Sequence, residues 1–358
     1  MSAEGLITLE RVMHDGTKVK ALATGGSFRR EDKIREHLKA VEEQLSQPSD
    51  EEASLRAQKA RERAAREKKE RMDKALSELE KIRATKSGEE KKEARASVTD
   101  PDARTMKQGD GGFAPSYNVQ ISTDAQADII IGVGVSQRPD DTQELVPALE
   151  RIEENLGKTP EQVVADGGYT NWDNVVALDA SGVDFIGSLT DRDQRAGSCA
   201  QRGVEDAFRP EHFVYDEQSD TYTCPEGKTL THNAHRTFIG RTNDLYTARK
   251  GDCASCPHKE QCCPGKTKRR SIVRRVDGPA VTSFKEKMAT EEAKAIYKQR
   301  AHIAEFPHAW IKEKIGLRQF HLRGLLKVGM EALWACLTYN IQQWIRLVWK
   351  PRLAKAGV

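Results

Sequence analysis

The sequence is poor in aromatic residues and lacks any long hydrophobic run. Phe, Trp and Tyr make up only 6% of the 358 residues, and the apolar fraction of 37% barely exceeds the charged fraction of 32%. An apolar N-terminal signal region is absent, as is any uninterrupted apolar stretch of about 18 residues. The most apolar segment, residues 328–349, contains Glu331 and Arg346. We therefore expect a core helix there, and no membrane partner.

An excess of one charge is also missing. The formal net charge is only +3, so the total charge does not by itself indicate a polyanionic partner. The distribution of charge along the chain is more informative, because basic residues gather in particular segments.

Cysteine is scarce outside one cluster, which holds four of the seven cysteines within residues 253–263. Without a signal peptide, this cluster favours metal binding or free thiols in a reducing cytoplasm over disulfides. One tetrahedral Zn²⁺ would suit four thiolates, although His258 and Cys263 compete as ligands and reduced thiols are the alternative. Cys199 and Cys336 are expected to be unrelated to the cluster, with Cys336 in the core. The candidate zinc ligands are Cys224, Cys253, Cys256 and Cys262.

Residues 29–98 contain no aromatic residue and are dominated by Arg, Lys, Glu and Ala. Their sparse apolar residues recur at spacings of three and four, which predicts a long helical hairpin. We expect the break near residues 47–50, with Asp50 as the N-cap of the second helix. The hairpin is interpreted either as a charged surface feature or as an arm that contacts DNA or a partner.

The rest of the chain predicts an α/β fold with a mixed sheet. Residues 1–28 hold a first strand that ends on Asp15, and residues 99–189 alternate strands and helices. Strands at 117–123 and 129–135 are expected to form an antiparallel hairpin. Further predicted elements are helices at 142–156 and 171–180, the latter capped by Asn171, and a strand at 183–188.

Residues 190–288 are interpreted as a β-rich insertion that carries the cysteines and a basic run at 266–275. This run predicts phosphate contacts, which would add affinity without sequence information; a solvated loop is the alternative. The basic residues proposed to bind DNA are Lys268, Arg269 and Arg270.

Residues 289–358 are expected to be C-terminal helices, with a kink or restart at Pro307. The last helix, at about 324–349, is predicted to turn one apolar face and its tryptophans towards the core. The residues expected on the buried face are Leu325, Val328, Met330, Leu333, Leu337 and Ile341, and the tryptophans are Trp334, Trp344 and Trp349.

Three acidic residues stand out as candidate metal ligands. Asp166 follows the apolar run Val163–Ala165 and precedes Gly-Gly, although Asp-Gly is also a common turn dipeptide. Asp15 likewise ends a predicted strand, and Glu305 lies on a predicted helix. Three carboxylates can hold two divalent cations about 3.5–4 Å apart for phosphodiester transfer, and Mg²⁺ prefers such hard oxygen ligands.

The chain resembles the DDE transposases of bacterial insertion sequences, in the branch with a Tyr-Arg-Glu-Lys signature. The resemblance covers nearly the whole chain. Its matching segments are DGTKVKA at 15–21, DPDARTM at 100–106, YNVQI at 117–121, VVADGGY at 163–169, CPEGKTL at 224–230, CASCPHKEQC at 253–262, and the signature block from Tyr297 to Asn340.

The resemblance implies a ribonuclease H-like core in which Asp15, Asp166 and Glu305 form the catalytic triad that binds Mg²⁺ or Mn²⁺. It implies that DNA is the partner, in a homo-oligomer, and that the protein acts at the nucleoid in the bacterial cytoplasm. It also implies that three residues of the signature block contact DNA phosphates near the cleavage site, namely Tyr297, Arg300 and Lys312.

Members of this family usually carry a helical DNA-binding domain before the first catalytic Asp, whereas 14 residues precede Asp15 here. The leading hypothesis is therefore a DNA transposase, or its catalytic fragment, that cuts and joins strands at element ends. One alternative is a truncated, non-catalytic remnant that binds DNA or full-length transposase. Another is a zinc-dependent nucleic-acid-binding protein without catalysis.

Overall fold

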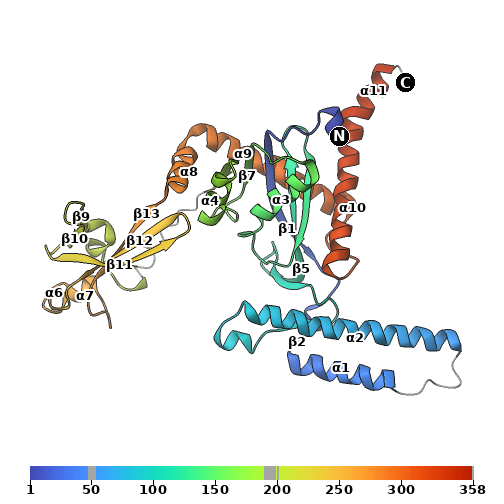
Figure 1. Ribbon diagram of the computed structural model, residues 1–358, viewed down its shortest axis with the longest axis horizontal. Coiled ribbons are helices and arrows are strands. Elements are labelled where there is room, and N and C mark those ends of the chain that lie inside the picture. Colours follow the sequence, from blue (N-terminus) through green and yellow to red (C-terminus); the bar gives the residue numbers. More distant parts are fainter. Residues whose placement is uncertain (47–53, 189–198, 200, 357–358) are drawn as a thin grey trace. The chain divides into compact units, whose positions relative to one another are not determined.

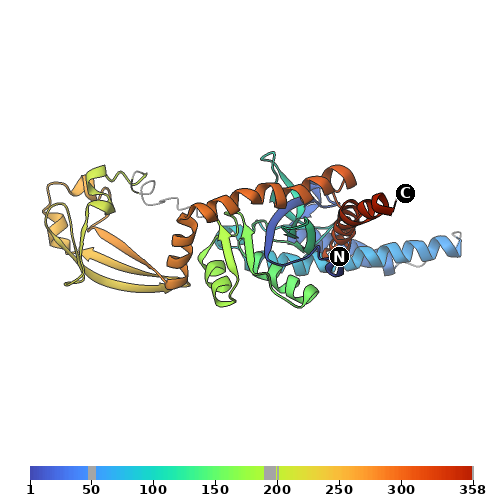
Figure 2. The ribbon, with the colours of Figure 1, turned by 90° about the horizontal axis from the view of Figure 1, so that it is seen from above.

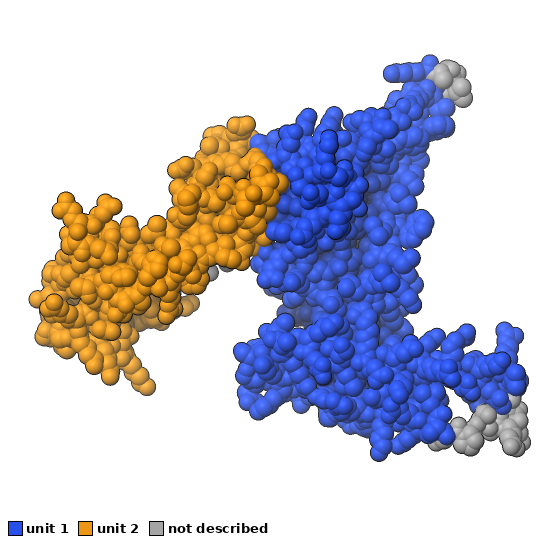
Figure 3. Space-filling model, in the orientation of Figure 1, with its two compact units in different colours: residues 1–169, 296–358 blue, residues 170–295 orange. Residues whose placement is uncertain are grey.

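The computed structural model describes residues 1–46, 54–188, 199 and 201–356. The chain divides into two compact units, one of residues 1–169 and 296–358 and the other of residues 170–295 (Figure 3). The five-part division expected from the sequence stays a prediction. The expected helix break at residues 47–50 and its Asp50 cap lie outside the described residues.

Unit 1 is built on a sheet in which β4, β5, β1 and β7 lie side by side in that order, while β6 also pairs with β5 (Figure 1). β5 is long enough to pair with β4 along its first part and with β6 along the rest. The strands are β1 (Arg11–Lys20), β4 (Arg104–Lys107), β5 (Phe113–Asp124), β6 (Ile129–Ser136) and β7 (Gln162–Ala165).

The strand directions confirm a mixed sheet. β5 and β6 form the predicted antiparallel hairpin, β1 is antiparallel to β5, and β7 is parallel to β1. The prediction that the first strand ends on Asp15 is wrong, because β1 continues to Lys20 and Asp15 lies in its middle. The strand passes through Asp15 and Gly16 because β5 pairs with it along this whole stretch, from Val12 to Lys20.

A helical hairpin occupies the region predicted for it. α1 (Glu31–Ser46) packs against α2 (Leu55–Ala84), and a short β2–β3 ladder (Phe28–Arg29 with Ala96–Ser97) closes its base. The helices run antiparallel, since Glu31 at the start of α1 pairs with Arg83 at the end of α2. The buried apolar residues at the contact are few, and the segment after α2 adds two of them: Ile34, Met72, Ala75 and Leu79 come from the helices, and Ala94 and Ala96 follow them.

The remaining helices of unit 1 include the end of α9 (Glu291–Trp310), together with α3 (Leu145–Leu156), α10 (Leu325–Trp344) and α11 (Lys350–Ala356). α9 continues through Pro307, so the predicted restart of the helix there does not occur. The irregularity follows four residues later, where Ile311–Ile315 widens to a π-helical turn. α10 packs on β6, and the Asn340 side chain hydrogen-bonds both backbone groups of Ile130.

The face of α10 that is buried differs from the predicted one. Val328 is buried as expected, but the helix rests on the sheet through small and polar-tipped residues, among them Ala332, Cys336 and Tyr339. This face of α10 packs on the sheet because its small side chains let the helix lie close to β6. The expected core residues that are exposed instead are Met330, Leu333, Trp334, Leu337, Ile341 and Trp349. None of the described helices is long and apolar enough to cross a membrane.

A turn at Asp100–Ala103 fixes the start of α10. Asp102 accepts a hydrogen bond of 2.7 Å from the Leu325 N–H and lies 2.6 Å from the Lys74 ammonium of α2. Asp100 accepts hydrogen bonds from the Tyr117 hydroxyl at 2.8 Å and from the Gly324 N–H at 3.1 Å. Two carboxylates therefore cap a helix that begins more than 200 residues further on.

Unit 2 contains a second sheet with the strand order β13-β12-β11-β10-β9. Figures 1 and 2 show its long strands β11, β12 and β13 side by side. The cap predicted for Asn171 is confirmed by a hydrogen bond of 2.9 Å from the Asn174 N–H. The elements are α4 (Trp172–Ala180), β8 (Asp184–Gly187), β9 (Val214–Asp216), β10 (Thr221–Thr223), β11 (Thr229–Phe238), β12 (Arg241–Ala248), α6 (Lys250–Ala254), α7 (Lys259–Cys262), β13 (Ser271–Asp277) and α8 (Pro279–Ala289).

We expect Asp102→Ala to destabilise unit 1 by about 1–3 kcal/mol, because it leaves the Leu325 N–H without its acceptor and Lys74 without its anion. Urea unfolding followed by circular dichroism measures this. Asp110→Ala, in an exposed turn, is the matched control and should stay within about 0.5 kcal/mol of the wild type. Equal stability of the two variants would show that the cap contributes nothing.

Candidate functional site

The register of β1 and β7 places two aspartates together. Met13 pairs with Val164 and His14 with Ala165 in the parallel ladder. The next residue on each strand is Asp15 and Asp166, so the two carboxylates follow the last paired residues of neighbouring strands. The Asp166 side chain accepts a 2.7 Å hydrogen bond from the Gly168 N–H, which orders the turn after β7.

Gly16 allows the close packing beside these aspartates. A Cβ at this position would lie 2.4 Å from the Gln120 amide nitrogen, 2.8 Å from the Asp141 carboxylate and 2.8 Å from the Tyr169 hydroxyl. Any side chain would therefore displace three polar groups. Glycine is required here because the neighbouring side chains, not the backbone angles, leave no room.

Asp141 is a further carboxylate at this site, and the sequence interpretation missed it. Its Oδ1 accepts hydrogen bonds of 2.6 Å from Asn118 and 2.8 Å from Gln120, and lies 3.5 Å from the Lys18 ammonium. It follows β6 by a few residues, as Asp166 follows β7. The same signal, an acid shortly after a buried strand, was present in the sequence.

A buried hydrogen-bond network holds Asp141 in place. The side-chain oxygen Oε1 of Gln120 accepts from the Tyr169 hydroxyl at 2.5 Å and lies 2.9 Å from His14 Nε2. The side-chain nitrogen Nε2 of Gln120 donates to Asp141. The other His14 nitrogen lies 2.9 Å from the Ser122 hydroxyl. Burial lowers the pKa of His14 to about 3, so its imidazole is neutral and donates through Nε2.

Glu305 is connected to Asp15 through Arg300. The Arg300 guanidinium lies 4.0 Å from the Asp15 carboxylate and 3.6 Å from that of Glu305, and it sits 5.7 Å from the centre of the Tyr297 ring. Arg300 is largely buried, with 14% of its side chain exposed, whereas 59% of Glu305 is exposed. α9 thus contributes a cation between two acids and a carboxylate that reaches solvent.

Two further basic groups fasten the C-terminal segment to β1. The His308 imidazole, which burial keeps neutral by lowering its pKa to about 4, donates to the Asp15 carbonyl at 3.2 Å. The Lys312 ammonium donates to the Thr17 hydroxyl. Burial also lowers the pKa of Lys312. Both contacts fix α9 and the turn after it against the strand that carries Asp15.

The electrostatic balance of the site favours an added cation. Burial, with a smaller effect of the charges of Asp166 and Glu305, raises the pKa of Asp15 to about 6 against the opposing effects of the Gly16 N–H and Arg300. Asp15, Asp166 and Glu305 therefore share one electrostatic neighbourhood. Carboxylate oxygens are the ligands that Mg²⁺ and Mn²⁺ prefer, so this donor set fits such an ion. In the described part of the chain, however, these three carboxylates do not gather within 4.8 Å of one another.

The cysteine cluster lies around one cavity in unit 2, which Cys224, Cys253, Cys256, Cys262 and Cys263 all line. Backbone N–H groups donate to the sulfurs of Cys224, at 3.3 Å, and Cys253, at 3.4 Å. The expectation that Cys199 is unrelated to the cluster is wrong, since it belongs to a small apolar group that Cys262 packs against. Cys336 is buried in the core, as predicted.

The basic run divides into exposed and buried residues. Lys268 and Arg269 are exposed. Arg270 is 8% exposed, and its guanidinium donates to the carbonyls of Cys262 at 3.2 Å and Phe208 at 2.9 Å. Arg270 therefore ties the cysteine segment to the sheet of unit 2, and little of its surface remains for a phosphate.

One comparison with known families bears on the class of protein. Residues 223–345 match the family described as Transposase DDE domain. This match supports a DDE transposase. The matched segment includes Glu305, Arg300 and the cysteine cluster, and it begins after Asp15 and Asp166 in the chain. No curated protein matches the sequence.

A site rich in carboxylates should cost stability without metal, and the pKa of Asp15 gives the pH range. The pKa of Asp15 rises from 3.8 to about 6 on folding. The contribution of protonated Asp15 to the free energy of unfolding is therefore fully present below about pH 4 and is lost as the pH rises through about 6. In a chelator, Asp15→Asn should therefore stabilise the protein by about 3 kcal/mol at pH 8 and by almost nothing near pH 4.

Chemical unfolding at several pH values measures this gain. Asp110→Asn is the control and should show no gain at any pH. If Asp15→Asn lowered stability at pH 8, the protein itself would stabilise the Asp15 carboxylate. The interpretation that this site needs a bound cation to neutralise its charge would then be wrong.

Proposed function

We propose that this protein is a DNA transposase with a ribonuclease H-like core. It would cut and join phosphodiester bonds at insertion-sequence ends with Asp15, Asp166 and Glu305 as its catalytic carboxylates. The observation that carries the proposal is the β1–β7 register, which brings Asp15 beside Asp166. The family match at residues 223–345 covers Glu305, which we propose as the third carboxylate.

The carboxylates of Asp15, Asp166 and Glu305 would hold Mg²⁺ or Mn²⁺, which supplies an activated water or 3′-hydroxyl and neutralises charge on the leaving oxygen. Asp141 is a further oxygen donor beside them. The protein's own groups keep the site rigid: His308 holds the backbone of Asp15, and Arg300 holds its carboxylate near that of Glu305.

Basic residues around the carboxylates would position DNA. Arg300 and Lys312 flank Asp15 and offer cations to phosphates near the cleaved bond, and Tyr297 lies against Arg300. Lys268 and Arg269 are exposed in unit 2 and would add contacts at a distance along the DNA backbone. A homo-oligomer on DNA and a location at the bacterial nucleoid follow from this function.

The cysteine cavity would hold a structural Zn²⁺ through Cys224, Cys253, Cys256 and Cys262. The N–H groups directed at two of these sulfurs support thiolate ligands, because such bonds stabilise negative charge on sulfur. Its role would be to keep the loops of unit 2 in place, away from the chemistry.

The direct test is cleavage of a DNA fragment that carries the sequences flanking this gene. With Mg²⁺ or Mn²⁺ the wild type should nick the fragment and transfer strands, and with a chelator it should not. Asp15→Asn, Asp166→Asn and Glu305→Gln should each lower the rate by on the order of 10³-fold or more. Asp110→Asn is the matched control and should retain full activity.

Cleavage by Asp166→Asn at the wild-type rate would refute the triad. DNA binding by the wild type without any cleavage would favour the alternative of a non-catalytic protein that binds DNA. That alternative also predicts that the chain associates with full-length transposase, which a pull-down would measure.

The salt dependence of DNA binding separates the residues of the basic run. Lys268→Ala and Arg269→Ala should each reduce the slope of log K against log salt by about 1, because each removes one phosphate contact. Arg270→Ala should instead lower the thermal stability of unit 2, since it removes two hydrogen bonds to buried carbonyls. An unchanged slope in the first two variants would show that the run is a solvated loop.

A further inference from the structure

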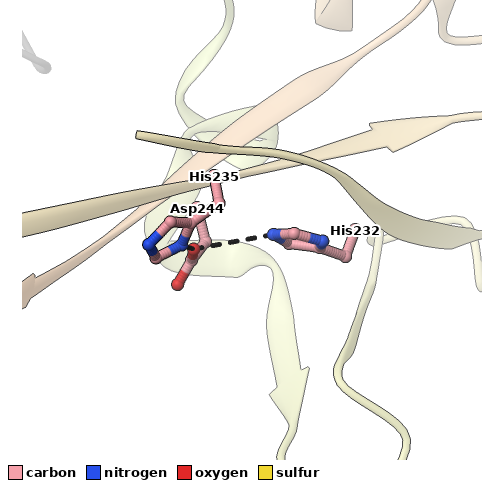
Figure 4. Close-up of side chains that lie close together, drawn as sticks. All are labelled: His232, His235 and Asp244. Carbon is pink, nitrogen blue, oxygen red and sulfur yellow. Dashed lines mark hydrogen bonds and ion pairs between the residues drawn. The ribbon is translucent and has the colours of Figure 1, made fainter. Parts of the chain in front are cut away.

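The paired strands β11 and β12 of unit 2 carry two histidines and an aspartate whose side chains point toward one another (Figure 4). His232 and His235 lie on β11, and Asp244 lies on β12. Their potential ligand atoms, two imidazole nitrogens and a carboxylate oxygen, all fall within 4.8 Å of one another. None of these three residues belongs to the carboxylate site or lines the cysteine cavity.

A β-bulge is what brings the histidines together. In a regular strand, residues three apart point to opposite faces of the sheet. The ladder shifts register between His232 and Ala234, so His232 pairs with Tyr246 and His235 with Asp244. Those partners are two residues apart on β12 and share one face. The extra residue at Asn233 therefore turns both imidazoles to the face of Asp244.

The distances suit a metal ion with nitrogen and oxygen ligands. His232 Nε2 lies 3.5 Å from Asp244 Oδ1, and His235 Nδ1 lies 2.5 Å from the same oxygen. Ligand atoms about 2.1 Å from a tetrahedral ion are about 3.4 Å apart, so the first pair already has the required separation. The second pair would open as coordination replaces its hydrogen bond.

Neighbouring groups orient the rings and leave the site open. The Thr237 hydroxyl lies 3.3 Å from His235 Nε2, which leaves Nδ1 directed at Asp244. His232 packs edge-on against the Tyr246 ring, with centroids 5.4 Å apart. The side chains of His232 and His235 are 38% and 54% exposed, so a metal ion and a water ligand can enter.

The cationic residue opposite Asp244 in the neighbouring ladder stacks on an aromatic ring. Arg274 pairs with Asp244 across the ladder to β13. Its guanidinium stacks over the Tyr215 ring, 4.3 Å from the centroid.

We propose that His232, His235 and Asp244 bind one divalent transition-metal ion, with Zn²⁺ as the preferred ion. The bound ion would link β11 to β12 across the bulge. Two imidazoles and one carboxylate select such ions over Mg²⁺.

Equilibrium dialysis of the full chain against Zn²⁺ tests the proposal. His235→Ala and Asp244→Asn should each bind one equivalent fewer than the wild type, or bind it at least about 10-fold more weakly. His212→Ala, an exposed histidine of the same unit, is the matched control and should bind as the wild type does. Circular dichroism of each variant checks that unit 2 is folded.

Titration with Co²⁺ distinguishes this site from the cysteines. The equivalent lost in His235→Ala should show visible d–d absorption without the near-ultraviolet band of a thiolate ligand. Unchanged Zn²⁺ stoichiometry and affinity in folded His235→Ala would overturn the proposal. A thiolate band in the difference between the Co²⁺ spectra of the wild type and His235→Ala would also overturn it. Neither outcome depends on whether the chain cleaves DNA.

Discussion

The parallel pairing of β1 with β7 is the constraint on which the candidate site depends. The ladder places Asp15 beside Asp166, the residue that follows the end of β7. A shift of one residue would turn Asp15 to the other face of the sheet and separate the two carboxylates. The long antiparallel contact with β5 holds β1 from its other side over Val12–Lys20, so such a shift would break two ladders at once.

That arrangement brings partly buried negative charges together, and the surrounding structure offsets them only in part. Arg300 lies between Asp15 and Glu305, and Lys18 lies beside Asp141. The pKa of Asp15 is nevertheless raised, chiefly by burial. A fold that leaves a carboxylate in this state is less stable at neutral pH than it would be with an uncharged residue. Such a cost is characteristic of sites that bind cations.

Much of the local structure could be predicted from the sequence. The β5–β6 hairpin, the charged helical hairpin and the Asn171 cap each follow from local sequence patterns. Asp166 and Glu305 could be proposed as ligands, but only together with residues far away in the chain. The position of Asp15 in mid-strand could not be predicted, because Asp-Gly ordinarily ends a strand and only the pairing with β5 carries β1 through it.

The errors share a tertiary cause. The periodicity of α10 identifies two apolar faces, and the close approach of Ala332 and Cys336 to β6 selects the less bulky one. Arg270 belongs to a basic run in the sequence, yet its guanidinium donates hydrogen bonds to two backbone carbonyls within the protein. The bulge in β11 brings His232 and His235 to one face, against the alternation that a strand pattern predicts.

The central claim is that Asp15 and Asp166 hold the same metal ion. Replacing Mg²⁺ by Fe²⁺ and adding ascorbate and peroxide generates hydroxyl radicals at the bound ion, which cut the nearest backbone. The account predicts that the full chain is cut near residues 15 and 166 together, that excess Mg²⁺ suppresses both cuts, and that Asp166→Asn abolishes both. Cuts near one aspartate alone, or only in residues 232–244, would contradict it.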